Sequence, residues 1–243
     1  MTAELRVDAQ EQGAELVVRP TGRLDLSTYP ALREELLSRA AEEPAAVVVD
    51  LDGLDVGSPD LLALFARVGA RMAAWPAIPL VVAVTDPRVR EVVEQVALAR
   101  RIAVRPSVTD ALVELPVVAA RQREWEEQLP AAPEAARLGR RCALDACRRW
   151  AVDDLAQDAA LLVSELVEFS VGCGCGRIEL RLELRSDGLG VVVHDDLRSG
   201  ARYTGGAQHV DPWDVVEGLA AASGCTNGPR AGRTLWAVLR AAR

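Results

Sequence analysis

Apolar and polar residues form two kinds of pattern along the first half of the chain. Uninterrupted apolar runs, such as Val47–Val49 and Leu80–Val84, are typical of strands covered on both faces. Between them, apolar residues recur at helical spacing through Leu32–Leu37, Leu61–Val68 and Val89–Val96. Strands that alternate with helices predict an α/β fold, with a mostly parallel sheet and crossover helices.

Further elements are predicted at the two ends of this half. Residues 4–20 contain the segments 5–7 and 15–19, which predict two strands separated by a polar turn from Asp8 to Gly13. Residues 102–104 predict a last strand, and Ser107 opens a last helix.

Residues that favour helix N-termini mark where two of the helices begin. Ser27 or Thr28 is the predicted cap of the first helix. The run Ser58-Pro59-Asp60 opens the second helix, with a serine cap and a proline in the first turn.

The second half has the opposite order of elements. The predicted elements are helices at 134–150 and 153–171, a hairpin of strands at 177–184 and 188–193, a helix at about 212–223 and a strand at 234–239. Helices followed by an antiparallel sheet predict an α+β sandwich.

The composition changes between the two halves. From residue 117 the chain turns polar and then rich in proline and alanine, which predicts a helical spacer followed by a stiff linker. With 243 residues, two domains are expected. The predicted boundaries are a first domain at 1–116, a linker at 117–133 and a second domain at 134–243.

The charged residues exclude several classes of function. The net charge is −8, and all 28 basic residues are arginine. An acidic chain lacks the basic excess of nucleic-acid-binding proteins, so no nucleic-acid partner is expected. The absence of lysine excludes a Walker lysine, a Schiff base and a kinase strand lysine.

No apolar run is long enough to span a membrane, and the first residues lack the features of a secretion signal. We therefore expect a cytoplasmic protein without a membrane partner. The five cysteines are an odd number, so we expect reduced thiols and no disulfide framework. Cys173-Gly174-Cys175 is half of a soft-metal motif, but a second half is missing. No metal site is predicted, and the role of the two cysteines stays open.

The first half resembles STAS domains, the fold of anti-anti-sigma factors, over nearly all of residues 1–115. The matching segments are Gly22-Arg23-Leu24-Asp25, the run from Val48 to Leu54, and the start of the second helix. The resemblance implies that the loop before this helix meets a cognate kinase, which phosphorylates a serine there. The loop contains Asp55, Ser58 and Asp60.

The family's usual acceptor serine aligns with Pro59, which has no hydroxyl group to phosphorylate. Ser58 aligns with the preceding serine. Two interpretations of Ser58 stay open. It is a plain helix N-cap, or it is a phosphoacceptor whose phosphate would be stabilised by the helix dipole.

The second half resembles the ATP-binding domain of anti-sigma serine kinases, in the GHKL superfamily, over about residues 134–241. The matching segments are Leu161 to Val167, Val193 to Asp196, Val215 to Ala220, and Gly232 to Trp236. The resemblance implies a site for ATP and magnesium. Several positions of that site are replaced, so we regard the domain as degenerate.

At the position of the magnesium-binding asparagine stands Phe169, which offers no oxygen to a hard cation. Leu197 replaces a glycine that makes room for the base. The glycine-rich lid aligns with Val210-Asp211-Pro212, which removes free amide groups and adds a negative charge. We therefore expect Phe169, Val171 and Cys173 to fill an apolar, partly collapsed pocket.

Three positions of the nucleotide site keep matching residues. Glu165 aligns with the general base, and Asp195 and Thr234 align with an adenine-binding pair. Each has a simpler interpretation: a carboxylate on a helix surface, a turn residue at a strand end, and an ordinary β-branched strand residue.

The sequence therefore predicts a non-catalytic regulatory protein of a partner-switching pathway, without a cofactor. Its expected partners are a sigma factor, a STAS protein or an anti-sigma kinase, with contact between its own halves or a homodimer as further options. Two alternatives remain: an active ATP-dependent serine kinase, and a sensor that binds a ligand or metal in the emptied nucleotide pocket.

Overall fold

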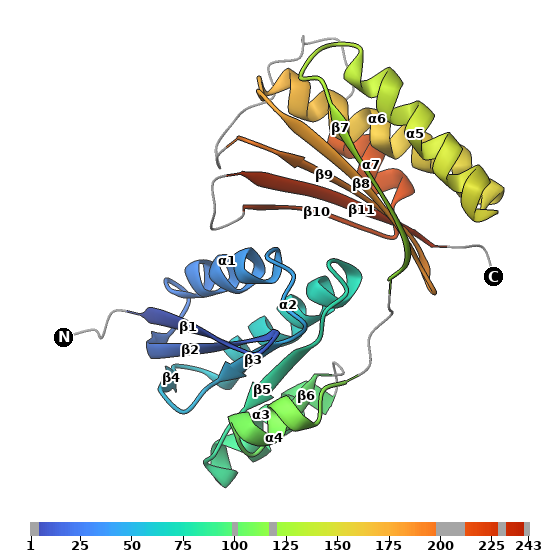
Figure 1. The fold of residues 1–243 in the computed structure, drawn as a ribbon. Coiled ribbons are helices and arrows are strands. Elements are labelled where there is room, and N and C mark those ends of the chain that lie inside the picture. The colour runs from blue at the N-terminus through green and yellow to red at the C-terminus, as the bar shows by residue number, and fades with distance from the viewer. Residues whose placement is uncertain (1–4, 99–101, 117–120, 198–211, 228–231, 241–243) are drawn as a thin grey trace. The chain divides into compact units, whose positions relative to one another are not determined.

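The computed structural model describes residues 5–98, 102–116, 121–197, 212–227 and 232–240, and Figure 1 shows the fold. The chain forms two compact units, Met1–Val118 and Ala119–Arg243. Each unit has its own sheet and its own apolar core. Within the described residues, no helix combines the length and the apolar character needed to cross a membrane.

The first unit alternates strands and helices around a mixed sheet. Its elements are β1 (Arg6–Gln12), β2 (Glu15–Leu24), α1 (Tyr29–Ala40), β3 (Val47–Asp50), β4 (Leu54–Val56), the 3-10 helix η1 (Pro59–Leu62), α2 (Ala63–Ala74), β5 (Leu80–Ala83), α3 (Pro87–Leu98), β6 (Ala103–Arg105) and α4 (Val108–Val113). The strand order is β1-β2-β3-β5-β6, and β4 pairs with β2. Only the β1–β2 pairing is antiparallel. The predicted α/β architecture is confirmed.

Helices cover both faces of this sheet. Val47 and Val49 pack with α1 and α2, whereas Val48 packs with Ala111 of α4 on the other face. Consecutive strand residues point to opposite faces, so three valines in a row serve two cores. This explains why the strand reads as an uninterrupted apolar run.

Two local predictions for the first unit need correction. The polar turn predicted from Asp8 to Gly13 is shorter, because β1 continues to Gln12 and only Gly13 and Ala14 form the turn. Gly13 adopts a φ of 71°, which glycine accepts without strain. The predicted second helix begins with a separate 3-10 turn, η1, before α2.

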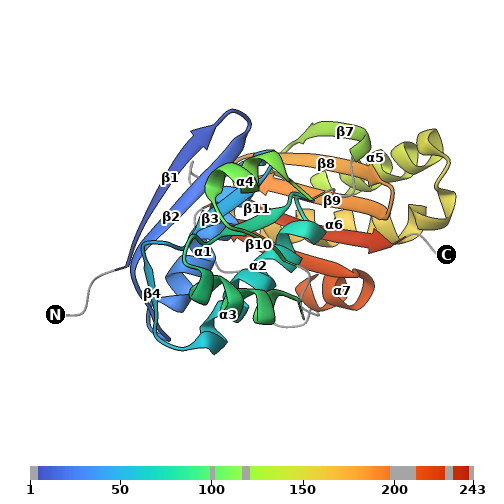
Figure 2. The ribbon, with the colours of Figure 1, turned by 90° about the horizontal axis from the view of Figure 1, so that it is seen from below.

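The second unit is a five-stranded antiparallel sheet with helices on one face. Its elements are β7 (Arg121–Leu129), α5 (Ala135–Trp150), the 3-10 helix η2 (Asp153–Leu155), α6 (Ala156–Gly172), β8 (Ile178–Arg185), β9 (Gly188–Asp195), α7 (Pro212–Leu219), β10 (Ala222–Asn227) and β11 (Arg233–Arg240). The strand order β10-β11-β9-β8-β7 can be followed in Figure 2.

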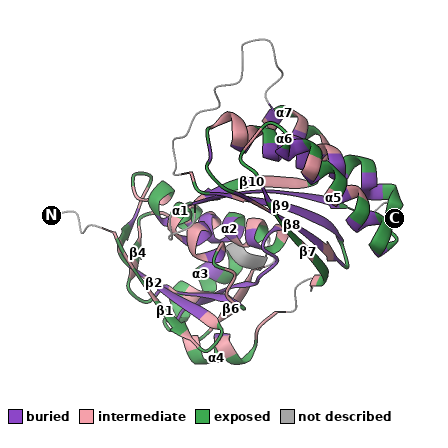
Figure 3. Ribbon diagram, turned by 45° about the horizontal axis from the view of Figure 1, so that its top comes forward, coloured by how far each residue is buried: buried purple, intermediate pink, exposed green. Residues whose placement is uncertain are grey.

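The helices of this unit lie along different strands. Helix α5 contacts β7 and β8, α6 contacts β9 and β11, and α7 contacts β10. In Figure 3 the sides of α5 and α6 that face the sheet are buried, and their outer sides are exposed. The predicted α+β architecture is confirmed at this level, and membership in the GHKL superfamily stays a prediction.

Two strands of the second unit were not predicted. Residues 121–129, expected as a helical spacer, form β7, an edge strand that pairs with β8. The helix predicted to reach residue 223 ends at Leu219, and residues 222–227 form β10. The helical prediction was wrong for β7 and for the last residues of the predicted 212–223 helix, and it was right for 212–219.

Candidate functional site

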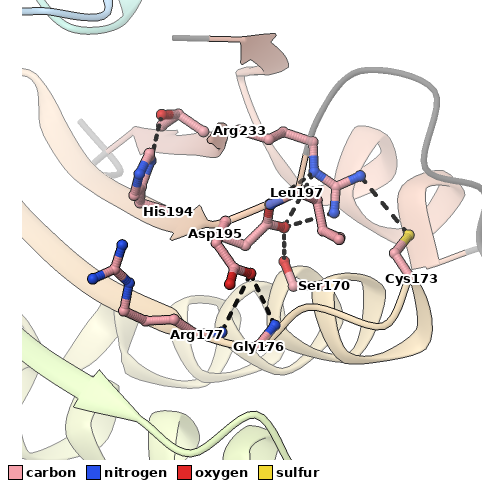
Figure 4. Close-up of polar contacts among 10 residues, drawn as sticks. Ser170, Cys173, Gly176, Arg177, His194, Asp195, Leu197 and Arg233 are labelled. Carbon is pink, nitrogen blue, oxygen red and sulfur yellow. Dashed lines mark hydrogen bonds and ion pairs between the residues drawn. The ribbon is translucent and has the colours of Figure 1, made fainter. Parts of the chain in front are cut away.

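Asp195 lies at the centre of a polar cluster in the second unit, where β9 ends and β11 begins (Figure 4). Arg233 stands directly opposite it in the antiparallel register. The Arg233 guanidinium donates to Asp195 from Nη2 at 2.6 Å and from Nε at 3.1 Å. Ser170 of α6 donates its hydroxyl group to the same carboxylate at 2.7 Å, and the Leu197 amide donates at 3.1 Å. The carboxylate is thus bonded entirely from within the protein.

The Asp195–Arg233 ion pair is buried. Asp195 is 1% exposed and Arg233 is 4% exposed. Burial opposes the charge of Arg233, but the hydrogen bond and the charge of Asp195 outweigh it and raise the pKa of the guanidinium. Removal of one partner would leave the other charge buried without compensation, which is strongly destabilising.

Aromatic rings surround the same guanidinium group. The Arg233 Cζ atom lies 5.0 Å from the centroid of the Phe169 ring, and the Phe169 and Trp213 rings lie 6.0 Å apart. Arg233 Nη1 also donates to Cys173 Sγ at 3.8 Å. Arg233 therefore links β11 to the end of α6, and Phe169 extends this packing to α7.

The neighbouring Asp196 holds the loop between α6 and β8. Its carboxylate accepts the amides of Gly176 at 2.8 Å and Arg177 at 3.3 Å. These backbone bonds, that of Gly176 foremost, lower the pKa of Asp196. A Cβ atom on Gly176 would lie 2.9 Å from Asp196 Oδ2, so glycine allows the close approach.

Thr234 is not brought together with Asp195. In the register of β9 and β11 Thr234 pairs with His194, and its Oγ1 lies 3.2 Å from His194 Nδ1. Directly paired residues share a face of a sheet and consecutive residues alternate. Thr234 therefore lies on the opposite face of the sheet from Asp195. Arg233 lies on the same face as Asp195.

The other predicted positions of the nucleotide site have different surroundings. Glu165 is partly buried one helical turn before Phe169 on α6, and burial, with the charge of Glu168, raises its pKa. Leu197 is partly buried and packs against the core of the second unit. Val210 and Asp211 lie outside the described residues.

Pro212 is buried at the start of α7. Phe169 and Val171 are only partly buried against the core.

The two cysteines after α6 differ in their surroundings. Cys173 is partly exposed beside Arg233, whereas Cys175 is buried. Burial, with the charges of Asp195 and Asp196, raises the pKa of Cys175 to about 11. In the part of the chain that the structure describes, no three His, Cys, Asp or Glu side chains gather in a way that could hold a metal ion.

In the first unit, the parallel pairing of β2 with β4 places the segments after Leu24 and Val56 at one edge. Ser58 lies there at the N-cap position of η1, with extended backbone angles. Its hydroxyl group makes no capping hydrogen bond. Ser58 thus has the place of an N-cap but lacks the bond that makes a cap stabilising.

Acidic residues and exposed apolar residues lie on the segments that neighbour Ser58. Asp60 is exposed in the first turn of η1, and Asp55 pairs with Arg23 at 3.4 Å near the surface. Leu26 is 83% exposed, and Val89 is 40% exposed on α3, which contacts η1. We call Leu26, Asp55, Ser58, Asp60 and Val89 the Ser58 surface. It combines an apolar part with carboxylates.

Helix α5 carries a row of exposed arginines. They are Arg137, Arg140, Arg141, Arg148 and Arg149. Two of them have specific contacts: Arg148 pairs with Asp145 at 3.2 Å, and Arg149 lies over the Trp125 ring at 4.8 Å. In a chain of net charge −8, this helix presents a positive surface.

The sequence pattern assigned no role to Arg233, Ser170 or Asp196. Arg233 was part of a matched segment, but the pattern gave no sign of its partner. The residue alternation along β11 was the available signal, because Arg233 and Leu235 share a face that points to the helices.

Comparison with known proteins identifies the first unit. Residues 6–111 match the family model of the STAS domain. The N-terminal unit is therefore a STAS domain, the fold of anti-sigma factor antagonists. No curated protein matches the chain significantly.

Several solved structures are similar to parts of the chain. An anti-sigma factor antagonist from Mycobacterium paratuberculosis is 23% identical, over 45% of this chain and 92% of that chain, with a TM-score of 0.40. A variant of RsbS from Moorella thermoacetica is 22% identical, over 44% and 92%, with a TM-score of 0.37. The RsbU and RsbW domains of a Mycobacterium tuberculosis protein are 16% identical, over 74% and 44%, with a TM-score of 0.36.

Proposed function

We propose that this chain is a regulatory protein of a partner-switching pathway that acts by binding other proteins and does not transfer phosphate. In this proposal the second unit is a GHKL-type kinase domain that has lost its catalytic function. The observation that carries the proposal is the buried Asp195–Arg233 pair, because it commits the carboxylate at the predicted adenine-binding position to an internal arginine.

ATP with magnesium does not fit the residues of this site. To accept the adenine amino group, Asp195 would have to release Arg233 and leave that charge buried. Phe169, at the position of the metal ligand, offers no oxygen atom and packs beside Arg233. Thr234 points to the other face of the sheet. These three positions all oppose nucleotide binding.

The first unit supplies the proposed binding function. STAS domains of anti-sigma factor antagonists work through protein partners, and residues 6–111 match that family model. The Ser58 surface combines exposed Leu26 and Val89 with Asp55 and Asp60. Protein interfaces commonly place apolar side chains at the centre and charges at the rim. This surface fits a partner with an apolar centre and a basic rim.

The exposed arginines of α5 supply a second surface, of opposite charge. A partner for this surface would carry carboxylates, as the STAS domain itself does around Ser58. Complementary charge speeds association and fixes the orientation of partners more than it strengthens binding. The proposed partners are a sigma factor, another STAS protein or a kinase-type anti-sigma factor, and a second copy of this chain is included.

Nucleotide titration tests the non-catalytic part of the proposal. The full chain is titrated with ATP and Mg²⁺ in a calorimeter, and is then incubated with labelled ATP and a set of STAS proteins. We expect neither saturable binding at millimolar ATP nor transfer of label. Transfer that is lost in Glu165→Gln would establish an active kinase and contradict the proposal.

Partner capture tests the binding part. The full chain is immobilised and exposed to lysate of its native cells, and bound proteins are identified by mass spectrometry. We expect a sigma factor, a STAS protein or an anti-sigma kinase that is displaced by free chain. Recovery of none of these three classes would contradict the partner-switching role.

A further inference from the structure

A cavity of about 360 Å³ lies in the second unit, at the end of the sheet away from Asp195. The start of β7, the turn between β8 and β9, and the segment from the end of α5 to η2 line it, and it is open to solvent. The lining residues are Gln122, Arg123, Trp150, Val152, Leu155, Leu184, Arg185, Ser186 and Gly188. The volume is in the lower part of the range for small-molecule sites in proteins.

The lining contains an apolar set and a polar set of residues. Trp150, Val152, Leu155 and Leu184 form the apolar set, and Trp150 is 7% exposed. Among the described residues, the polar part of the lining contains two arginines but no carboxylate. A molecule in this cavity would therefore meet both aromatic surface and positive charge.

Only one of the two arginines has its charge balanced. Arg185 pairs with Asp187, which belongs to the same turn, at 3.2 Å. Arg123 donates to the carbonyl oxygen of Arg149 at 3.4 Å and forms no ion pair among the described residues. A carbonyl oxygen does not neutralise a guanidinium group. The cavity therefore has one cation without a carboxylate partner.

The local backbone places these side chains around the cavity. The register of β7 and β8 shifts between Arg121 and Arg123, so Gln122 is the extra residue of a β-bulge. In a regular strand, Gln122 and Arg123 would point to opposite faces. A bulge redirects side chains, and here both residues line the cavity.

Glycine is required at another part of the wall. Gly188 has a φ of 155°, and a Cβ atom there would lie 1.9 Å from the carbonyl oxygen of Leu239. No other residue fits beside this neighbouring strand. The bulge and the close approach of β11 to Gly188 give this end of the sheet an irregular shape.

We propose that this cavity binds a small organic monoanion with an aromatic or other apolar body, such as an aromatic carboxylate. The carboxylate would accept hydrogen bonds from Arg123, and the apolar body would lie against Trp150 and Leu155. The proposal goes beyond the proposed function, because it concerns another end of the second unit and a small molecule. Bound ligand would tie the start of β7 to the end of α5.

A panel of matched carboxylates and amides tests the charge requirement. Benzoate, phenylacetate and indole-3-acetate are compared with their primary amides, with the full chain and saturation-transfer NMR followed by calorimetry. We expect saturable 1:1 binding of at least one acid, and binding of its amide weaker by about tenfold or more. No binding by any acid, or equal affinity for acid and amide, would overturn the proposal.

Substitutions locate the binding site. Arg123→Gln is expected to weaken binding of the acid by about tenfold or more, whereas Arg140→Gln, which removes an exposed arginine of α5 outside the cavity, leaves it unchanged. Ser186→Tyr, at the exposed turn, is expected to block entry. Circular dichroism checks that each variant is folded.

Trp150 provides an internal readout. Ligand binding is expected to change the tryptophan fluorescence of the chain, and Trp150→Phe is expected to abolish that change while Trp213→Phe retains it. If Arg123→Gln is unfolded, Ser186→Tyr and the Trp150 readout decide the matter. Binding that persists unchanged in Arg123→Gln, or in Ser186→Tyr, would overturn the proposal.

Discussion

Arg233 is the residue on which the interpretation of the second unit depends most. It satisfies Asp195, approaches Cys173 and lies against the Phe169 ring. A buried charge is tolerated only when its hydrogen-bonding groups are paired. Here the pairing is internal, so the same contacts that stabilise the fold remove the groups that a ligand would need.

Removal of this arginine is expected to destabilise the second unit. Arg233→Ala leaves the Asp195 carboxylate buried beside Ser170, and the expected loss in the free energy of unfolding is about 3–5 kcal/mol. The double variant Asp195→Asn, Arg233→Met removes both charges and is expected to lose less. Denaturant unfolding monitored by circular dichroism measures both.

The matched control is Arg240→Ala, which removes an exposed arginine at the other end of β11. It is expected to change the free energy of unfolding by about 0.5 kcal/mol at most. An Arg233→Ala variant as stable as this control would show that the ion pair contributes nothing to the fold.

Glu165 makes the stability of the folded protein depend on pH, and the direction of this dependence can be predicted. Its pKa in the folded protein is raised from the ordinary value of 4.5 by burial and by Glu168. The neutral carboxyl form is thus favoured in the folded protein, so stability contributed by this group is present below pH 4.5 and is lost as the pH rises through the folded pKa.

The variant Glu165→Gln tests this dependence. It is expected to raise the Tm at pH 7 and to have little effect at about pH 3, because the carboxyl group is then largely neutral in both folded and unfolded chains. Glu168→Gln serves as a comparison on the same helix. A Glu165→Gln variant that is less stable than the parent at pH 7 would contradict the assignment.

At the scale of elements, α6 is joined to α7 by one aromatic contact that can be tested. Phe169 and Trp213 pack with their rings 6.0 Å apart. Phe169→Asn is expected to lower the free energy of unfolding by about 1–2 kcal/mol, less than for a fully buried ring, because Phe169 is only partly buried. Hydrogen exchange should show faster exchange in α7.

The comparison for this variant is Phe169→Leu, which retains an apolar side chain. It is expected to preserve most of the protection of the α7 amides from hydrogen exchange. If Phe169→Asn leaves the exchange of α7 unchanged, the ring contact does not hold this helix, and its packing on β10 must suffice.

The sequence predicted helices and strands correctly where burial requires apolar residues at a regular spacing. The helix of residues 156–172 and the strands around Val48 and Val191 carry apolar residues that core packing requires. Strand β7 has no such requirement. Trp125 and Leu129 stand four positions apart, which imitates a helix, but β7 is an edge strand whose pairing with β8 fixes its conformation.

Strand β10 was not predicted, for a related reason. Its residues are small or polar, with little intrinsic preference for strands, and it forms because β11 offers an edge for pairing. Prediction of the site failed at the scale of single residues. Whether Arg233 or Thr234 shares a face with Asp195 depends on a register shift of one residue, which the sequence does not encode locally.

At the scale of the whole molecule, an acidic chain presents a basic helix. Arg140 and Arg141 are exposed on α5, and neither forms an ion pair among the described residues. Arg140→Glu with Arg141→Glu is expected to slow association with an acidic captured partner by about tenfold or more at low salt. Surface plasmon resonance at several salt concentrations measures the rate.

The control for this double variant is Arg33→Glu with Arg67→Glu, which reverses two exposed charges on α1 and α2 of the other unit. If the control slows association equally, the effect comes from net charge and α5 is not the docking surface.

Ser58 has the place of a helix cap without a cap's hydrogen bond, and exposed Leu26, Asp60 and Val89 lie on segments that neighbour it. We therefore expect Ser58→Glu to weaken binding of a captured STAS-directed partner by about tenfold or more, since a carboxylate would be added to an apolar contact region. Thr109→Glu adds the same charge on α4, at the opposite face of the sheet, and should leave binding unchanged. Calorimetry with the purified partner measures both. Equal affinity for the two variants would place the partner's contact away from η1.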